Sequence, residues 1–167
     1  MFPTDERDER QTAAVPAGLV LAGLGRRLGG FAIDQVLVLV PVAVGAVIIG
    51  FRAGDTFSTD ELFGLNIAMA ASRLIYETLL IGFFGRTVGK IATRTRVVNQ
   101  ADGGPVTWFA AGQRALMPVL FSGLPEFSVF WAIGVYGLAL LGPLRQGMHD
   151  RAAGTLVVLN GSVAAEA

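Results

Sequence analysis

The stretch GRRLGGFAIDQVLVLVPVAVGAVIIGF, residues 25–51, decides the fold. After Arg26 and Arg27 it continues for more than twenty residues with Asp34 as its one ionisable side chain. A bilayer core of about 30 Å needs roughly twenty apolar helical residues, so the stretch predicts a membrane-spanning helix. It also raises a question, because a carboxylate inside a span costs about 2.5–3.5 kcal/mol on insertion scales.

Composition agrees with a membrane protein. The chain has 167 residues, of which 53% are hydrophobic and 16% charged, and its mean hydropathy is +0.58. Thirteen basic and thirteen acidic residues cancel, which leaves no net field to attract nucleic acid. No cysteine and a single histidine, His149, argue against disulfides, a thiol nucleophile or a metal site. We expect the lipid bilayer as partner, no nucleic acid, no metal and no cofactor.

Further apolar segments extend this prediction to several helices. Residues 29–51 and 62–84 are each long enough to span, while the third apolar region, 114–144, is long for one helix and short for two. Pro118 and Pro125-Glu126 interrupt it, and we expect two short helices that meet near Pro125-Glu126. The predicted fold is an all-α membrane protein with three to four transmembrane helices, the last pair short and broken.

Two polar segments have the character of strands. RVVNQADGGPVTW (96–108) alternates around Asp102-Gly103-Gly104, which is a turn signal, and GTLVVLN (154–160) is rich in β-branched residues. We expect a small strand or hairpin element on the cytoplasmic side. Together with the spans, this divides the chain into an N-terminal tail or interfacial lead-in (1–23), a membrane domain (24–159) and a C-terminal tail (160–167).

The distribution of basic residues predicts the orientation. The link at 52–61 holds one arginine against three acidic residues, whereas segment 85–113 is strongly basic. Because Lys and Arg are enriched in cytoplasmic loops, the N-terminus and segment 85–113 are predicted to be cytoplasmic. Arg145 and Arg151 favour a cytoplasmic C-terminus as well, which requires an even number of crossings; a single third span would instead place the tail outside.

Three ionisable groups lie within the predicted spans: Asp34, Arg73 and Glu77. Asp34 and Glu77 are both on the order of 10 Å from the cytoplasmic ends of their helices at 1.5 Å rise per residue, and Arg73 shares a face with Glu77. Such a cluster has one excess negative charge and could bind a proton or a small cation. Alternatively, Arg73 and Glu77 hold helices together and Asp34 accepts a hydrogen bond.

The sequence GRTVGK (85–90) does not match a phosphate-binding loop, because three residues rather than four separate its glycines and Ile91 follows the lysine. We interpret Thr87, Gly89 and Lys90 as a tight cytoplasmic turn with Lys90 touching lipid phosphate. No nucleophile and base pair is evident, so the chain is not expected to be an enzyme.

Several motifs resemble the RDD family of small bacterial membrane proteins. They are RRLGGFAID, YETLLIGFFGRTVGK, RVVNQADGGPVTWFAAGQRAL and LRQGMHDRAAGTLVV, and they cover residues 24–159 in order. The resemblance assigns the signature arginine to Arg27 and the two aspartates to Asp34 and Asp150. Asp150 follows the last apolar region, and could reach Arg27. The resemblance implies the bacterial cytoplasmic (inner) membrane; family function is largely unassigned, although some members are associated with sodium–proton exchange.

Two hypotheses on function remain open. In the first, the chain is a transport module in which Asp34, helped by Glu77, handles protons or small cations on a path through a homo-oligomer. In the second, it is a non-catalytic accessory or scaffold subunit of a larger membrane complex.

Overall fold

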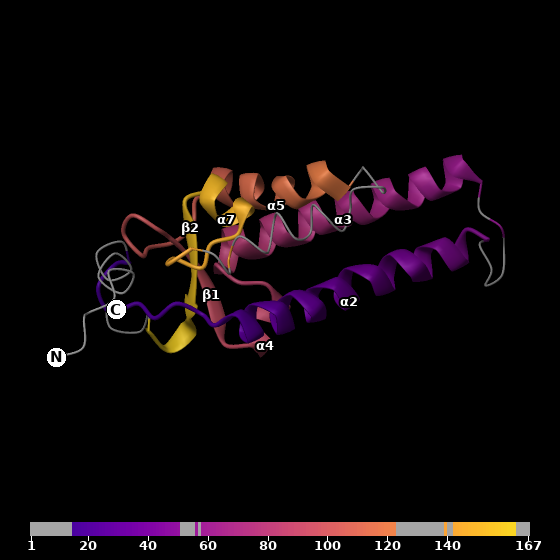
Figure 1. The fold of residues 1–167 in the computed structure, drawn as a ribbon. Helices are drawn as coiled ribbons and strands as arrows, with labels where there is room; N and C mark the ends of the chain where they lie inside the picture. The colour runs from indigo at the N-terminus through magenta and orange to yellow at the C-terminus, as the bar shows by residue number, and fades with distance from the viewer. Residues whose placement is uncertain (1–14, 51–55, 57, 123–138, 140–141, 163–167) are drawn as a thin grey trace.

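The computed structural model describes residues 15–50, 56, 58–122, 139 and 142–162. Two long helices run side by side in opposite directions, and shorter elements gather at one of their ends (Figure 1). Both helices are long and apolar enough to cross a membrane, which confirms the prediction of two apolar helices in these places. They are α2 (Leu24–Ile48) and α3 (Thr59–Phe84).

Helix α2 has the surface expected of a helix in lipid. Its buried residues are Gly30, Asp34 and Val38, which recur every four positions and therefore form one narrow stripe. Large apolar side chains such as Val36 and Val44 are more than half exposed. In water an exposed apolar surface of this size would be unfavourable, whereas in a bilayer it is the expected outer face.

Helix α3 is defined at both ends by local signals. A capping box at its start joins Ser58 and Glu61, each accepting a backbone N–H from the other. Gly85 ends the helix in the left-handed conformation at φ 67°, where glycine carries no steric cost. Helix α5 (Trp108–Ser122) packs along α3, and the Trp108 ring lies directly over Gly82.

The cap, as we call the elements at that end of α2 and α3, is built around a two-stranded sheet (Figure 1). Its strands pair antiparallel with Val97 opposite Val157, and Leu21, just before α2, forms a bridge to Val158. This confirms the small β element predicted in these two segments. The cap comprises α4 (Val88–Ala92), β1 (Thr95–Asn99), α7 (Met148–Ala152), β2 (Thr155–Leu159) and a 3₁₀ turn, η2 (Asn160–Ser162).

The structure corrects the expectation around the third apolar region. Residues after the turn at 102–104 form no strand, and α5 begins at Trp108 rather than at 114. The reason is Thr107, whose hydroxyl accepts the Ala110 N–H at 3.2 Å and starts the helix before the apolar run begins. Pro118 lies inside α5 without ending it.

Several predictions concern residues outside the described ranges. The second short helix and the turn at Pro125-Glu126 fall there, as do residues 1–14 and 163–167 of the predicted tails. The count of three to four spans and the division at residues 24 and 159 therefore stay predictions.

Gly82→Ala should destabilise the protein, because the added methyl carbon would lie 2.4 Å from the Trp108 ring and would force α5 away from α3. We expect a loss of about 1–3 kcal/mol in unfolding followed in detergent by tryptophan fluorescence. Gly112→Ala is the matched control on the same interface, since its methyl would meet Thr78 at an ordinary 3.9 Å. Equal effects of the two substitutions would contradict this packing.

Candidate functional site

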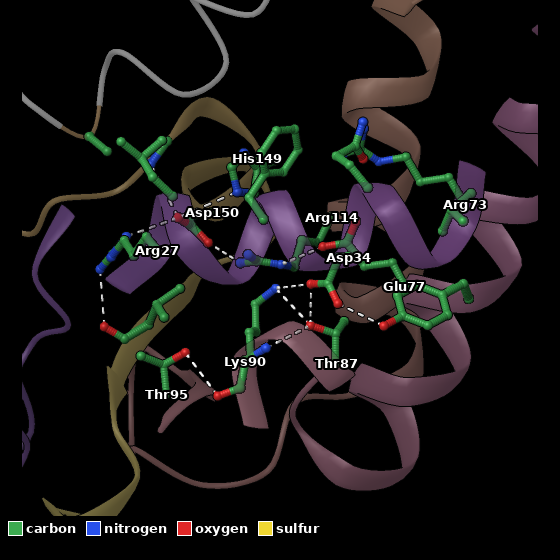
Figure 2. Close-up of a pocket in the computed structure, with 18 of the residues that line it drawn as sticks. Arg27, Asp34, Arg73, Glu77, Thr87, Lys90, Thr95, Arg114, His149 and Asp150 are labelled. Atoms are coloured by element: carbon green, nitrogen blue, oxygen red, sulfur yellow. Dashed lines mark hydrogen bonds and ion pairs between the residues drawn. The ribbon is translucent and has the colours of Figure 1, made fainter. Parts of the chain in front are cut away.

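A cavity of about 80 Å³ lies between α2, α3 and α5 on one side and the cap on the other, with room for a few water molecules. Figure 2 shows that charged side chains from all of these elements converge on it. Its ionisable lining residues are Arg27, Asp34, Arg73, Tyr76, Glu77, Lys90, Arg114, His149 and Asp150. The cavity therefore contains every intramembrane charge and every signature residue predicted from the sequence.

Asp34 is held by hydrogen-bond donors from two other elements (Figure 2). Its Oδ1 accepts the Tyr76 hydroxyl at 2.7 Å and the Gly89 N–H at 2.8 Å. Its Oδ2 accepts the Thr87 hydroxyl at 2.5 Å, and the Lys90 ammonium lies 3.9 Å away. With only 8% of its surface exposed, Asp34 obtains from α3 and the turn into α4 the hydrogen bonds that water would otherwise supply.

The contact between α2 and α4 depends on two glycines. A methyl carbon on Gly89 would lie 2.0 Å from the Gly30 carbonyl oxygen, and one on Gly30 would lie 3.1 Å from the Gly89 carbonyl oxygen. The two backbones therefore touch directly, and this contact brings the Gly89 N–H within reach of Asp34. Thr87 caps α4 through the Lys90 N–H at 3.4 Å while donating its own hydrogen to Asp34.

Lys90 turns into the cavity. Its side chain is 14% exposed and lies beside Asp34, which differs from the expected contact with lipid phosphate. Burial lowers the pKa of Lys90, an effect that the nearby Glu77 and Asp34 carboxylates oppose. The ammonium is thus a buried charge whose counterions come from two membrane helices.

Asp150 is the centre of a second group of contacts. Its carboxylate pairs with Arg114 of α5 through Oδ1 and with Arg27 at 3.5 Å through Oδ2, which also accepts the Gly147 N–H at 3.2 Å. Burial alone would raise the pKa of Asp150, yet the guanidinium groups, Arg114 foremost, lower it to about 2. Asp150 is therefore ionised throughout the physiological range.

Arg27 ties the start of α2 to the segment 145–157, which lies 118 to 130 positions away in sequence. It donates to the carbonyl oxygens of Ala22 at 3.1 Å and Val157 at 3.0 Å, to that of Arg145, and to Asp150. This agrees with the prediction that Asp150 could reach Arg27. A planar guanidinium with several fixed donors suits such a junction better than an ammonium would.

Glu77 and Arg73 have contacts that the sequence did not predict. The Glu77 carboxylate pairs with Arg114 at 3.4 Å, so α3 is joined through Arg114 to the cap. The Arg73 guanidinium lies over the Phe31 ring, 5.1 Å from its centre. The predicted trio of Asp34, Arg73 and Glu77 shares one cavity, but Asp34 has its direct contacts with the α4 turn and Tyr76.

The direct ion pairs give a balanced network. Carboxylates at Asp34, Glu77 and Asp150 face Lys90, Arg114 and Arg27 in the pairs described above. The charges in these pairs cancel, and Arg73 adds a further positive charge to the same cavity. The excess negative charge inferred from the three intramembrane groups alone is therefore not a property of the folded cavity. Sequence reasoning gave neither Arg114 nor Tyr76 a place in the site.

A resident metal finds no obvious ligand set in this cavity. Within the ranges that the structure covers, no three His, Cys, Asp or Glu side chains are grouped closely enough to hold a metal ion. The oxygen atoms nearest to one another are those of Asp34, Tyr76 and Thr87, a set suited to weak binding of a small hard cation rather than to a permanent metal centre.

These features define a helical membrane protein with a charged cavity under a small cap. The sequence profile of the RDD family matches residues 21–154, and the chain belongs to this family. Neither the comparison with curated proteins nor the comparison with solved structures found a match.

Gly89→Ala should separate α4 from α2, since its methyl would collide with Gly30 and with the Asp34 carboxylate. We expect a loss of at least about 2 kcal/mol in the free energy of unfolding, because a buried carboxylate would lose a hydrogen bond and the packing would be strained. Gly29→Ala is the control, as its methyl would meet Thr93 at an ordinary 3.6 Å. A Gly89→Ala protein as stable as this control would contradict the described contact.

Acidification should destabilise the protein through His149. Burial lowers the pKa of His149 to about 4 from 6.5, against the pull of Asp150. Between these two pKa values, His149 is protonated in the unfolded chain but not in the folded one. The free energy of unfolding is therefore unaffected by His149 above pH 6.5 and falls by up to about 3 kcal/mol as the pH drops towards 4. Thermal melts across this range should show the decline, and His149→Gln should flatten it. Identical curves for both proteins would refute the assignment.

Proposed function

We propose that this RDD-family protein is a multi-pass protein of the bacterial cytoplasmic membrane that handles protons or small cations at Asp34. The observation that carries the proposal is the Lys90 ammonium 3.9 Å from Asp34 inside the cavity between the membrane helices and the cap. Ionisable groups at such depth are costly and mark ion or proton pathways by default. Buried ion pairs are also weak stabilisers compared with apolar packing, which favours a functional reason for keeping this one.

Lys90 is the replaceable partner of Asp34. The other contacts of the carboxylate are hydrogen bonds of 2.5 to 2.8 Å, whereas the ammonium is at ion-pair distance only. If Lys90 gives up its proton, a small cation can occupy the position beside Asp34 without changing the net charge. One proton then leaves for each monovalent cation that enters, and the cation is cargo rather than a resident metal.

Transport requires a route across the remaining membrane, and we propose that a homo-oligomer provides it. The cavity lies at the cap end of α2 and α3, and a chain of this size lacks the repeats with which large transporters enclose a path. Neighbouring copies would supply the missing walls against the exposed apolar faces of α2.

The orientation that we propose has the cap in the cytoplasm. Within the described ranges, the cap end carries the basic residues between α3 and α5, and the far end carries Asp60 and Glu61. This asymmetry supports a cytoplasmic cap. The pairing of β1 with β2 supports an even number of crossings between them, since paired strands share one side of the membrane.

The decisive experiment measures cation-dependent proton movement in everted membrane vesicles. Addition of sodium or potassium should dissipate a pH gradient with the wild-type protein, and Asp34→Asn at matched expression should reduce the rate at least tenfold. Asp60→Asn removes an exposed carboxylate at the far end of α3 and should leave the rate unchanged. Exchange that survives Asp34→Asn would refute the proposed site.

The second candidate is an accessory or scaffold subunit of a larger membrane complex. Its support is the completeness of the network, in which Asp34 has three close donors and the paired charges balance. This candidate predicts no exchange, poor accumulation of the Asp34→Asn protein, and copurification of one stoichiometric larger partner from native membranes. Recovery of a homo-oligomer alone would count against it.

A further inference from the structure

Two exposed arginines adopt a backbone conformation that arginine rarely takes. Within the described ranges, Arg94 at φ 55° and Arg145 at φ 49° are the non-glycine residues with positive φ. This left-handed region is sterically unfavourable for residues with a Cβ atom and is normally occupied by Gly, Asn or Asp. Both side chains are exposed, and neither contributes to the ion pairs of the cavity.

The chain itself provides the comparison for Arg94. Helices α4 and α7 have the same length, and each is followed by one capping residue and then by a left-handed residue. After α7 that residue is Gly154, at φ 59°, as the usual helix ending requires. After α4 it is Arg94 instead. The backbone does not favour arginine here, which points to a use for its guanidinium group.

Both arginines lie at the level where the membrane span begins. The carbonyl oxygen of Arg145 accepts from Arg27 in the first turn of α2. Arg94 follows Thr93, whose side chain lies beside Gly29 and Gly30 of the same helix. Helix α4, just before Arg94, exposes Val88 and Ile91. Apolar side chains next to exposed arginines are typical of the boundary between acyl chains and headgroups.

The exposed charged side chains at the cap end of the helices are mostly positive. Arg26 and Arg151 are exposed together with Arg94 and Arg145. Among the described residues at this end of the helices, Asp102 is the one exposed carboxylate. Exposed aromatic rings at the cap ends of α3 and α5 mark the same boundary: Phe83, Phe84, Trp108 and Phe109.

We infer that Arg94 and Arg145 bind the phosphate groups of anionic phospholipids in the leaflet that faces the cap. Guanidinium groups pair well with phosphate oxygens, and anionic lipid attracts basic residues that emerge at the membrane surface. The strained conformation at both positions is maintained because glycine, which would fit the backbone better, could not make this contact. The inference is independent of transport at Asp34.

The test compares melting temperatures in phosphatidylcholine nanodiscs with and without phosphatidylglycerol. The wild-type protein should melt several degrees higher with the anionic lipid. The double variant Arg94→Gly, Arg145→Gly should be at least as stable as wild type in phosphatidylcholine alone, because glycine relieves the backbone, and should keep less than half of the gain from phosphatidylglycerol. The double variant with lysine at both positions retains the charge and should keep most of that gain.

Other outcomes would overturn the inference. They are a wild-type protein indifferent to phosphatidylglycerol, a glycine variant with the full gain, or a glycine variant that is less stable in phosphatidylcholine. Inorganic phosphate added to phosphatidylcholine nanodiscs separates a lipid surface from a free anion site; a gain as large as that from the lipid would contradict a headgroup site. If the glycine variant fails to fold, asparagine at both positions provides a second neutral pair that tolerates the left-handed region.

Discussion

A carboxyl group within a membrane helix must obtain its hydrogen bonds from the protein, and this requirement at Asp34 governs the rest of the structure. Asp34 lies on the one buried stripe of α2, and its donors come from Tyr76 and from the turn that begins α4. The donors can approach only because Gly30 and Gly89 let two backbones touch. The glycines, the short α4 helix and the inward lysine therefore together replace the water that the Asp34 carboxylate loses on burial.

The cap depends on a second junction that uses the same physics at the membrane boundary. Asp150 lies between Arg114 and Arg27. Arg27 also donates hydrogen bonds to the carbonyl oxygens of Ala22 and Val157. Arg114 also reaches Glu77, so one guanidinium connects a membrane helix to the cap. The three residues that the resemblance assigns to the RDD signature, Arg27, Asp34 and Asp150, thus occupy the two junctions that hold the cap on the helices.

Much of the fold could be predicted, because hydropathy and β-branched runs are local signals. They located α2, α3 and both strands. The start of α5 was missed because it depends on a single capping threonine, Thr107, ahead of the apolar run. For the site, the sequence predicted several of the residues but not how they contact one another. Depth and helical spacing identified Asp34 and Glu77. The contacts of Asp34 with Tyr76 and Gly89, and of Glu77 with Arg114, join residues 37 to 55 positions apart on different elements, and periodicity carries no information on such pairs.

The most direct test of this account is a double-mutant cycle between Asp34 and Thr87, measured by unfolding in mild detergent. Asp34→Asn, Thr87→Val and the double variant would give the interaction energy of the bond that joins α2 to the turn of α4. The account predicts a coupling of about 1.5–3 kcal/mol, the range for a hydrogen bond to a charged group. Effects that add within about 0.5 kcal/mol would contradict it and would show that α4 is held on the membrane helices by other contacts.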